Sequence, residues 1–230
     1  GGPLHAWCDW LLFRHERLSR VTVHLGGLAT LSVIPANPDP CDVTDYDVGP
    51  GTIVLDELAH KFHHKLHDSD GSIAAAGRTD PAMLNELMAH PYFQVDPPKK
   101  THTFEWSQTY VWRLMQIAQK HGVEGANILA TSTELTARTI AQAVSRLPER
   151  PHEIILTGGG AMNIHLAGRI RTLLSPSSTY TAEKYGLSIR GKQAVCWGIL
   201  AAARMDGVSA HCRQATGAAR DAVLGAIVLP

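Results

Sequence analysis

The pattern of hydrophobic and polar positions predicts a strand-rich start followed by helices. "VTVHLGGLATLSVIP", residues 21–35, holds two apolar runs rich in β-branched residues around a pair of glycines, which predicts a β-hairpin. "NPDPCDVTDYDVGPG" follows, and its many Asn, Asp, Pro and Gly residues predict a turn-rich loop. From Thr52 onward, helical spacing predicts a helix whose apolar face consists of Leu55, Leu58, Ala59, Phe62 and Leu66.

The second half of the chain alternates helices with strands. Helices are predicted over about residues 81–89, 106–120 and 125–147, and the last of these ends before a Pro-Glu-Arg-Pro sequence. "HEIILTGGGAMNIHLAGRIRTLL", which starts at His152, predicts a strand, a glycine turn and a helix. A short strand near 178–182 and a helix over about 190–204 follow. This alternation predicts an α/β fold.

Composition and charge narrow the function classes. The chain has 230 residues, of which 44% are hydrophobic and 18% charged, which is enough to bury one large or two small cores. Lys plus Arg equals Asp plus Glu at 21 each, so no overall field attracts nucleic acid or anionic membranes. The longest apolar run is too short to span a bilayer and no signal peptide is apparent, so a cytoplasmic location is expected. A start at Gly1 instead of Met indicates a fragment or a processed chain.

Two groups of potential metal ligands give little support for a metal site. The four cysteines show no C-x-x-C spacing and are expected to be reduced, mostly buried thiols; they are Cys8, Cys41, Cys196 and Cys212. "HKFHHKLH" brings four histidines together at spacings that zinc ligands use, but the predicted apolar stripe lies elsewhere on the helix. We therefore expect a solvent-facing position and no metal for His60, His63, His64 and His67.

The strongest candidate for a ligand site is "LTGGGAMN", residues 156–163. Three glycines between a hydrophobic strand and a helix let the backbone approach a ligand, and the amides that begin the helix favour negative charge or polar edges. The stretch fails the dinucleotide fingerprint G-x-G-x-x-G, because Asn163 stands where the third glycine is needed. The alternative is a tight turn that serves helix–sheet packing.

Two other glycine turns, "HLGGLAT" and "DYDVGPGT", lie at predicted strand ends. Their amides can face phosphate, and Asp47 can hold magnesium directly or through water. The alternative is that Asp47 caps a turn while Gly49 and Gly51 supply positive φ angles. Three glycine turns in one α/β chain favour the ligand-binding interpretation.

"GLSIRGKQAVCWGILA", residues 186–201, is almost a phosphate-binding P-loop. It has two glycines five positions apart and then Lys192, but the P-loop needs a Ser or Thr after the lysine to hold magnesium. Gln193 occupies that place, so the pattern alone does not show whether this segment is a P-loop.

Together, and in this order, these stretches resemble the anhydro-N-acetylmuramic acid kinase family, a branch of the actin-like ATPase and sugar kinase superfamily. "GGPLHAWCDWLLF" is similar to the family's G-A-P-L…L-F segment, "HLGGLATLSVIP" to its N-I-G-G-I-A-N strand pair, and "DYDVGPGTIVLDE" to its D-T-G-P-G-N…D motif. "ILATSTELTARTIAQAV", "LTGGGAMNIHLAGRI" and "TGAARDAVLG" continue the series. The resemblance therefore covers nearly the whole chain.

The resemblance implies the ribonuclease-H-like second domain of the actin-like ATPase and sugar kinase fold, with a mixed sheet flanked by helices. It assigns residues 1–20 to a remnant of an inter-domain segment and residues 21–230 to a C-terminal nucleotide-binding domain. The family's N-terminal half, with a first phosphate loop and the general-base Asp, would lie upstream of Gly1. The chain is therefore expected to be the C-terminal half of a longer protein, and no convincing general base is found within it.

The activity implied by the resemblance is a sugar kinase reaction that uses ATP and Mg²⁺. Water opens the anhydro ring as phosphate is transferred to the 6-hydroxyl of the sugar, which gives N-acetylmuramic acid 6-phosphate. Magnesium and positioned donors carry most of such catalysis. The implied partners are ATP and a small amino sugar, without nucleic acid or membrane, and a homodimer is left open.

The resemblance also assigns binding residues. The three glycines of "LTGGGAMN" would lie along the adenosine, the glycine pair of "HLGGLAT" would face the phosphates, and Asp47 would serve magnesium or a bound water. The nucleotide-binding set comprises Gly26, Gly27, Gly49, Gly51, Gly158, Gly159, Gly160 and Asn163.

Several family positions carry a different residue in this chain. The family's acidic positions after the last glycine turn fall on Arg190 and Gln193, so the apparent P-loop is a helix start and Lys192 is no Walker lysine. Polar positions of the family's other motifs are occupied by Thr30, Val48 and Thr52. Two alternatives therefore stay open: a catalytically silent homologue that binds nucleotide or sugar, and an α/β nucleotide binder that is not a kinase.

Overall fold

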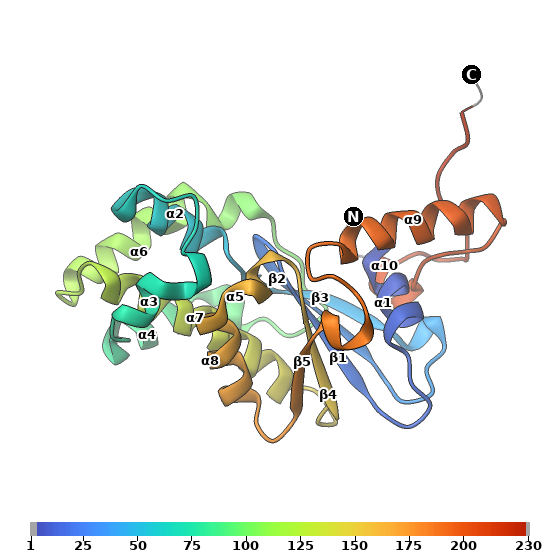
Figure 1. Ribbon diagram of the computed structural model, residues 1–230, viewed down its shortest axis with the longest axis horizontal. Coiled ribbons are helices and arrows are strands. Elements are labelled where there is room, and N and C mark those ends of the chain that lie inside the picture. The colour runs from blue at the N-terminus through green and yellow to red at the C-terminus, as the bar shows by residue number, and fades with distance from the viewer. Residues whose placement is uncertain (1–3, 229–230) are drawn as a thin grey trace.

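A mixed five-stranded sheet forms the centre of the molecule in the computed structural model, which describes residues 4–228 (Figure 1). Its order is β3-β2-β1-β4-β5; β1, β2 and β3 pair antiparallel, whereas β4 pairs parallel with β1 and β5. The α/β fold with a mixed sheet flanked by helices is therefore confirmed. The strands are β1 (Arg20–Leu25), β2 (Leu28–Ile34), β3 (Thr44–Pro50), β4 (Glu153–Thr157) and β5 (Ser178–Thr181).

Helices precede, interrupt and follow these strands. The α-helices are α1 (His5–Phe13), α2 (Ile53–His63), α3 (Ser72–Ala76), α4 (Pro81–Met88), α5 (Pro91–Gln94), α6 (Gln108–Lys120), α7 (Ala126–Ser145), α8 (Ile164–Leu174), α9 (Lys192–Met205) and α10 (Arg213–Thr216). Short 3₁₀ segments are η2 (Pro40–Asp42), η3 (Ser69–Gly71), η4 (Thr103–Trp106), η5 (Gly159–Met162) and η6 (Ala182–Tyr185).

One face of the sheet is covered by α7 and α8. Successive side chains of a strand point to opposite faces, so the alternating residues Val21 and Leu25 of β1 share this face. Both are fully buried, together with Ile140 of α7 and Leu166 of α8. Each such side chain contributes roughly 1.5–3 kcal/mol by its removal from water.

The opposite face of the sheet is covered by α1 and α9, which lie together on one side of Figure 1. Phe13 of α1 and Cys196 of α9 are fully buried there. Thr22 of β1 points to this side and donates a hydrogen bond to Asp9 of α1. The two faces therefore differ, because this one carries buried polar groups as well as apolar ones.

A second apolar core is built by α2, α4 and α6 with the first turns of α7, beside the sheet and away from α9 in Figure 1. Its largest buried side chain is Trp106, and Leu58, Met83 and Leu114 are fully buried around it. The chain between β3 and β4 forms this helical part. One of its helices, α2, starts beside the glycine turn after β1.

Residues 44–50 form β3, so the prediction of a loop is wrong for this segment. Tyr46 and Val48 enter the apolar core, while Asp45 and Asp47 alternate with them and bind polar partners. This is the period of two that a strand requires. Asp is depleted in strands, which hides the pattern from a reading based on residue type.

The helix predicted from Thr52 ends earlier than expected. His64 adopts φ 53°, which ends α2 at His63. Leu66 lies beyond this end and is 83% exposed, and Phe62 in the last turn of α2 is 36% exposed, so neither belongs to the buried face that the spacing predicts.

The hairpin, the three middle helices and the strand–turn–helix with its following strand and helix are confirmed within a few residues. The sequence analysis did not identify α1, α3, α5 and α10. Three of the four cysteines are buried and all four are free, as predicted. Within residues 4–228, no helix is both long and apolar enough to cross a membrane.

Candidate functional site

A cavity of about 620 Å³ opens where the turn after β1, the turn after β4 and the start of α2 meet. This volume lies within the range of small-molecule sites, roughly 300–1,000 Å³. Of the residues predicted to bind nucleotide, the cavity wall contains Gly26, Gly27, Gly159, Gly160 and Asn163. The structure therefore brings together two glycine turns that lie more than a hundred residues apart in the sequence.

The three glycines after β4 differ in the space that surrounds them. Gly158 has φ 81°, and a Cβ there would lie 2.7 Å from the carbonyl oxygen of Leu25. A Cβ on Gly160 would lie 2.7 Å from Cγ2 of Thr52. Gly159 has no positive φ and a Cβ there would meet nothing within 4 Å. Packing therefore explains Gly158 and Gly160, whereas Gly159 faces open space in the cavity.

Backbone amides supply donors at one wall of this cavity. Within the described chain, the amides of Gly159 and Gly160 donate to no protein acceptor, although each borders the cavity. The amides at the start of α2 are different, because those of Thr52 and Ile53 donate to the carbonyls of Gly26 and Gly27 at 2.8 and 3.2 Å. An anion would therefore find free amides at the turn after β4 and not at the start of α2.

The rest of the cavity wall combines exposed apolar groups with carboxylates. Leu66 and Met162 are 83% and 41% exposed and can cover the flat face of an aromatic ligand. Asp56 and Asp70 also border the cavity, and burial raises the pKa of Asp56 above its usual range. None of these four residues was assigned to the binding set from the sequence, although Met162 lies in "LTGGGAMN" and Asp56 in "DYDVGPGTIVLDE", because only the glycines, Asp47 and Asn163 of these motifs were singled out.

Asn163 has a structural duty as well as a place in the cavity wall. Its side-chain oxygen accepts a hydrogen bond from the amide of Leu166 at 2.9 Å and caps α8. Asp68, which also borders the cavity, caps α3 by accepting from the amides of Ile73 and Ala74. These two caps fix the direction in which α8 and α3 leave the cavity.

Of the motif around Asp47, only its last residue, Thr52, lines this cavity. The carboxylate of Asp47 accepts hydrogen bonds from the Thr30 hydroxyl at 3.1 Å and the Thr101 amide at 3.0 Å. Gly49 lies against Phe93, and Gly51 lies close to the backbone of Gly26. Asp47, Gly49 and Gly51 are therefore not in the cavity wall; the first is held in a hydrogen-bond network and the glycines are explained by packing. The magnesium role of Asp47 stays a prediction.

A second, polar cavity of about 240 Å³ lies on the α1–α9 side of the sheet. The wall of this polar pocket consists of His5, Asp9, His24, Thr30, Ser32, Asp45, Lys192 and Gln193. Asp45 is buried and forms an ion pair with Lys100 at 2.6 Å. Burial raises the pKa of Asp45, and the charge of Lys100 opposes that rise.

A buried ion pair joins α9 to α1 in the polar pocket. Lys192 is 3% exposed and binds the carboxylate of Asp9, which is 1% exposed. The second oxygen of Asp9 accepts hydrogen bonds from Thr22 at 2.6 Å and Ser32 at 3.1 Å. The ammonium group of Lys192 is therefore bound by Asp9 of the same chain, which agrees with the prediction that Lys192 is no P-loop lysine. A lone acid on the apolar helix "HAWCDWLLF" is the signal that was overlooked for Asp9.

His24 lies between the two cavities. Its Nδ1 is 3.2 Å from the Thr157 hydroxyl, and its ring approaches Gly26 and Gly158, whose turns border the glycine-lined cavity. Burial lowers the pKa of His24 to about 4, and the positive charge of Lys192 adds to this effect. His24 is therefore neutral at pH 7 and can accept or donate a single hydrogen bond at the boundary.

The lowered pKa of His24 predicts a loss of stability in mild acid. The unfolded histidine binds a proton below about pH 6.5, whereas the folded one does so only below about 4. The unfolded state therefore binds more protons in this window, and stability falls as pH drops from 7 to 4 by up to roughly 3 kcal/mol. Asp45, with its raised pKa, acts in the opposite direction near the acid end.

Chemical denaturation of the wild type and the H24Q variant at several pH values measures this contribution. The variant is expected to show a clearly shallower loss of stability between pH 7 and 4.5. Equal slopes for the two proteins would mean that His24 is not the group responsible.

The histidines at 60, 63, 64 and 67 lie at the end of α2 and just after it. They are exposed or partly exposed, and within residues 4–228 none of them belongs to a group of three or more side chains whose ligand atoms lie close enough to share an ion. Within residues 4–228, the group of side chains close enough to share an ion is Asp39, Cys41 and Asp42, at the surface around η2. Asp39 and Asp42 already cap each other there.

Comparisons with known proteins give a consistent result. The family model described as "Anhydro-N-acetylmuramic acid kinase" matches residues 1–230. A curated protein of that name from Salinibacter ruber is 34% identical over 100% of this chain and 59% of its own length. Relatives of the same name from Cyanothece sp. and Bacillus cereus are 33% and 32% identical, over 98% and 100% of this chain and 61% of their own lengths.

The chain thus spans about three fifths of the length of the curated relatives it matches. The expectation of a C-terminal half is wrong in its extent, because the matched share of each relative exceeds one half.

A solved structure supports the fold. The activator of the 2-hydroxyisocaproyl-CoA dehydratase from Clostridium difficile, solved with bound ADPNP, superimposes with a TM-score of 0.53 at 12% identity. The likeness covers 84% of this chain and 62% of that one. At this identity it shows the fold alone, in agreement with the actin-like ATPase fold expected from the sequence.

Proposed function

The chain belongs to the anhydro-N-acetylmuramic acid kinase family, and from this premise we propose that it supplies the nucleotide-binding side of an ATP-dependent sugar kinase. The observation that carries the proposal is the convergence of two glycine turns on one cavity, with the free amides of Gly159 and Gly160 in its wall. Free amides at a strand-to-helix turn bind phosphate oxygens or polar ring edges without a side chain.

The nucleotide would be held by groups of three kinds. Leu66 and Met162 would pack against the adenine. The glycine turn after β4 would follow the nucleotide closely, because Gly159 leaves that wall open. Gly26 and Gly27 would lie nearer the phosphates.

Mg²⁺ is the cofactor that such a reaction requires, since it neutralises charge on the transferred phosphoryl group. Carboxylates are its preferred protein ligands. Asp56 and Asp70 in the cavity wall fit this chemistry: partial burial raises the pKa of Asp56, and a nearby cation would stabilise its charged form. We propose these two as metal-facing groups, beside the earlier assignment of Asp47.

The polar pocket would receive the amino sugar. It lies next to the glycine-lined cavity across His24, so an acceptor oxygen bound there would face the phosphates. Water would add to the anomeric carbon as the bond from that carbon to the ring oxygen at position 6 breaks. This oxygen would take the γ-phosphoryl group of ATP, the bond from the γ-phosphorus to the bridging oxygen would break, and ADP would leave. The proton released by water needs an acceptor, and the buried carboxylate of Asp45 is the chemically suitable group in this pocket.

A catalytically silent homologue that binds nucleotide or sugar is the second candidate. The Asp9–Lys192 pair and the neutral amide of Gln193 favour it, because they leave fewer free carboxylates in the polar pocket. Both candidates require nucleotide or sugar binding, and they differ in turnover. A homodimer stays an expectation.

Photoaffinity labelling with 8-azido-ATP and Mg²⁺ tests the proposed nucleotide site. We expect adducts in peptides that contain residues 66–70 or 159–163, because these line the cavity. An excess of ATP should suppress them. Labelling confined to other segments, or labelling that ATP does not suppress, would contradict the proposed site.

A further inference from the structure

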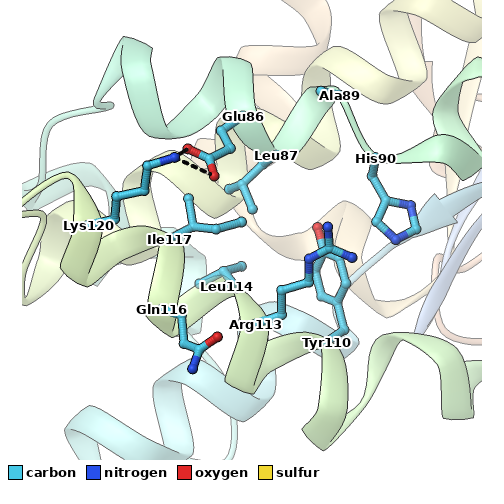
Figure 2. Close-up of a pocket in the computed structure, with 10 residues that line it drawn as sticks. All are labelled: Glu86, Leu87, Ala89, His90, Tyr110, Arg113, Leu114, Gln116, Ile117 and Lys120. Carbon is cyan, nitrogen blue, oxygen red and sulfur yellow. Dashed lines mark hydrogen bonds and ion pairs between the residues drawn. The ribbon is translucent and has the colours of Figure 1, made fainter.

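A cavity of about 450 Å³ lies between α4 and α6 in the helical part of the molecule (Figure 2). It shares no wall residue with the glycine-lined cavity or the polar pocket. Its wall consists of Glu86, Leu87, Ala89, His90, Tyr110, Arg113, Leu114, Gln116, Ile117 and Lys120. The proposed nucleotide and sugar sites leave this cavity without a role.

Three hydrogen-bond donors in this wall have no protein acceptor within the described residues. Arg113 is an exposed residue at the mouth of the cavity, and its guanidinium forms neither an ion pair nor a hydrogen bond with the described residues. The hydroxyl of Tyr110 is buried and unpartnered, in a side chain that is 5% exposed. Nδ1 of His90 accepts from the Tyr92 amide at 3.3 Å, which leaves the proton on Nε2, and Nε2 has no partner there.

A buried hydroxyl without a partner is unfavourable, because it loses its hydrogen bonds to water. Burial lowers the pKa of His90, the positive charge of Arg113 lowers it further, and Glu105 opposes the shift. Burial raises the pKa of Tyr110, and the charge of Arg113 opposes that rise. Figure 2 shows Arg113, Tyr110 and His90 at the same end of the cavity. This end therefore offers donors and positive charge without an acceptor.

The charges at the other end are already matched. Glu86 accepts hydrogen bonds from Lys120 at 2.8 Å and is 2.7 Å from Nε2 of His121, as the dashed lines in Figure 2 show for Lys120. Between the two ends lie the apolar side chains of Leu87, Leu114 and Ile117. The free charge that faces the cavity is thus the positive charge of Arg113.

We propose that this cavity binds a small organic carboxylate with an apolar body. The carboxylate accepts from Arg113, with the Tyr110 hydroxyl and Nε2 of His90 as further donors. The apolar body lies over Leu87, Leu114 and Ile117. A carboxylate matches the planar fork of a guanidinium, and the cavity volume suits a small ligand.

Benzoate and its neutral isostere benzamide provide the probes for an NMR titration of the full chain. Benzoate should bind with a Kd of about 1 mM or tighter, a modest value for a ligand of this size. The shifted amides should lie in α4 and α6, and benzamide should bind at least about tenfold more weakly. Absence of shifts with benzoate at about ten times that concentration, or equal binding of the two probes, would overturn the proposal.

Two variants separate binding from folding. R113Q should weaken benzoate at least about tenfold, since it removes the charge and keeps much of the side-chain length. Y110F should weaken benzoate about threefold or more, and its melting temperature without ligand should equal or exceed that of the wild type, because it removes an unpartnered buried hydroxyl. The control is R171Q on α8, an exposed arginine outside the cavity, which should leave benzoate binding unchanged.

A purely structural role for these residues gives a different result. In that case Y110F would lower the melting temperature, or R113Q would bind benzoate as the wild type does. Either result would overturn the assignment of a carboxylate site.

Discussion

Replacement of Lys192 by Met is expected to lower the free energy of unfolding by about 3–5 kcal/mol. Lys192 and Asp9 are 3% and 1% exposed and form an ion pair between α9 and α1. Removal of the cation leaves the Asp9 carboxylate buried, with only the hydroxyls of Thr22 and Ser32 to stabilise its charge. An uncompensated buried charge costs far more than a lost surface pair.

Urea denaturation of three variants measures this effect. K192M alone should show the full loss. The double variant D9N/K192M should recover more than half of it, because a neutral amide can still accept from the two hydroxyls. K184M removes one partner of Glu153, which keeps Arg20 and Tyr185. The lysine of that pair is 41% exposed, so K184M should cause only a small fraction of the loss. A similar loss for K192M and K184M would mean that the Asp9–Lys192 pair is not buried as described.

The sequence could predict the elements whose local pattern agrees with their surroundings. The hairpin of β1 and β2 and the turn between β4 and α8 follow from apolar runs interrupted by glycine. The strand β3 could not be predicted in this way, because its polar positions, Asp45 and Asp47, bind Lys100 and the backbone of Thr101. Their favourable environment comes from residues more than fifty positions away, which a local pattern does not contain.

The candidate site was predicted only in part, because a local pattern does not contain the surroundings of each residue. Glycine motifs identify turns, and two of the three turns meet in one cavity. The third, around Gly49 and Gly51, is explained by close contact with Phe93 and with the backbone of Gly26. A glycine required by packing and a glycine required by a ligand look alike in a sequence. Only the space around each one, as at Gly159, separates the two cases.

Gly159 gives the second large effect. Substitution by Ala is expected to leave stability almost unchanged, because its Cβ meets nothing within 4 Å and its φ is negative. The same Cβ would project toward the space proposed for the nucleotide, and we expect ATP·Mg²⁺ affinity to fall at least about tenfold. G160A should behave differently, because its Cβ would lie 2.7 Å from Cγ2 of Thr52 and 2.9 Å from Cβ of Leu25. That contact should lower stability by about 1–3 kcal/mol.

The measurement that tests the central claim most directly is calorimetric titration of ATP·Mg²⁺ into the wild type, G159A and G168A, with the melting temperature of each protein. Gly168 lies in α8 with open space around it and outside the cavity, so it is a matched control. The account predicts saturable binding to the wild type and G168A, and at least about tenfold weaker binding to G159A at an almost unchanged melting temperature. Equal affinity of the three proteins for ATP·Mg²⁺ would contradict the claim that the glycine-lined cavity is the nucleotide site.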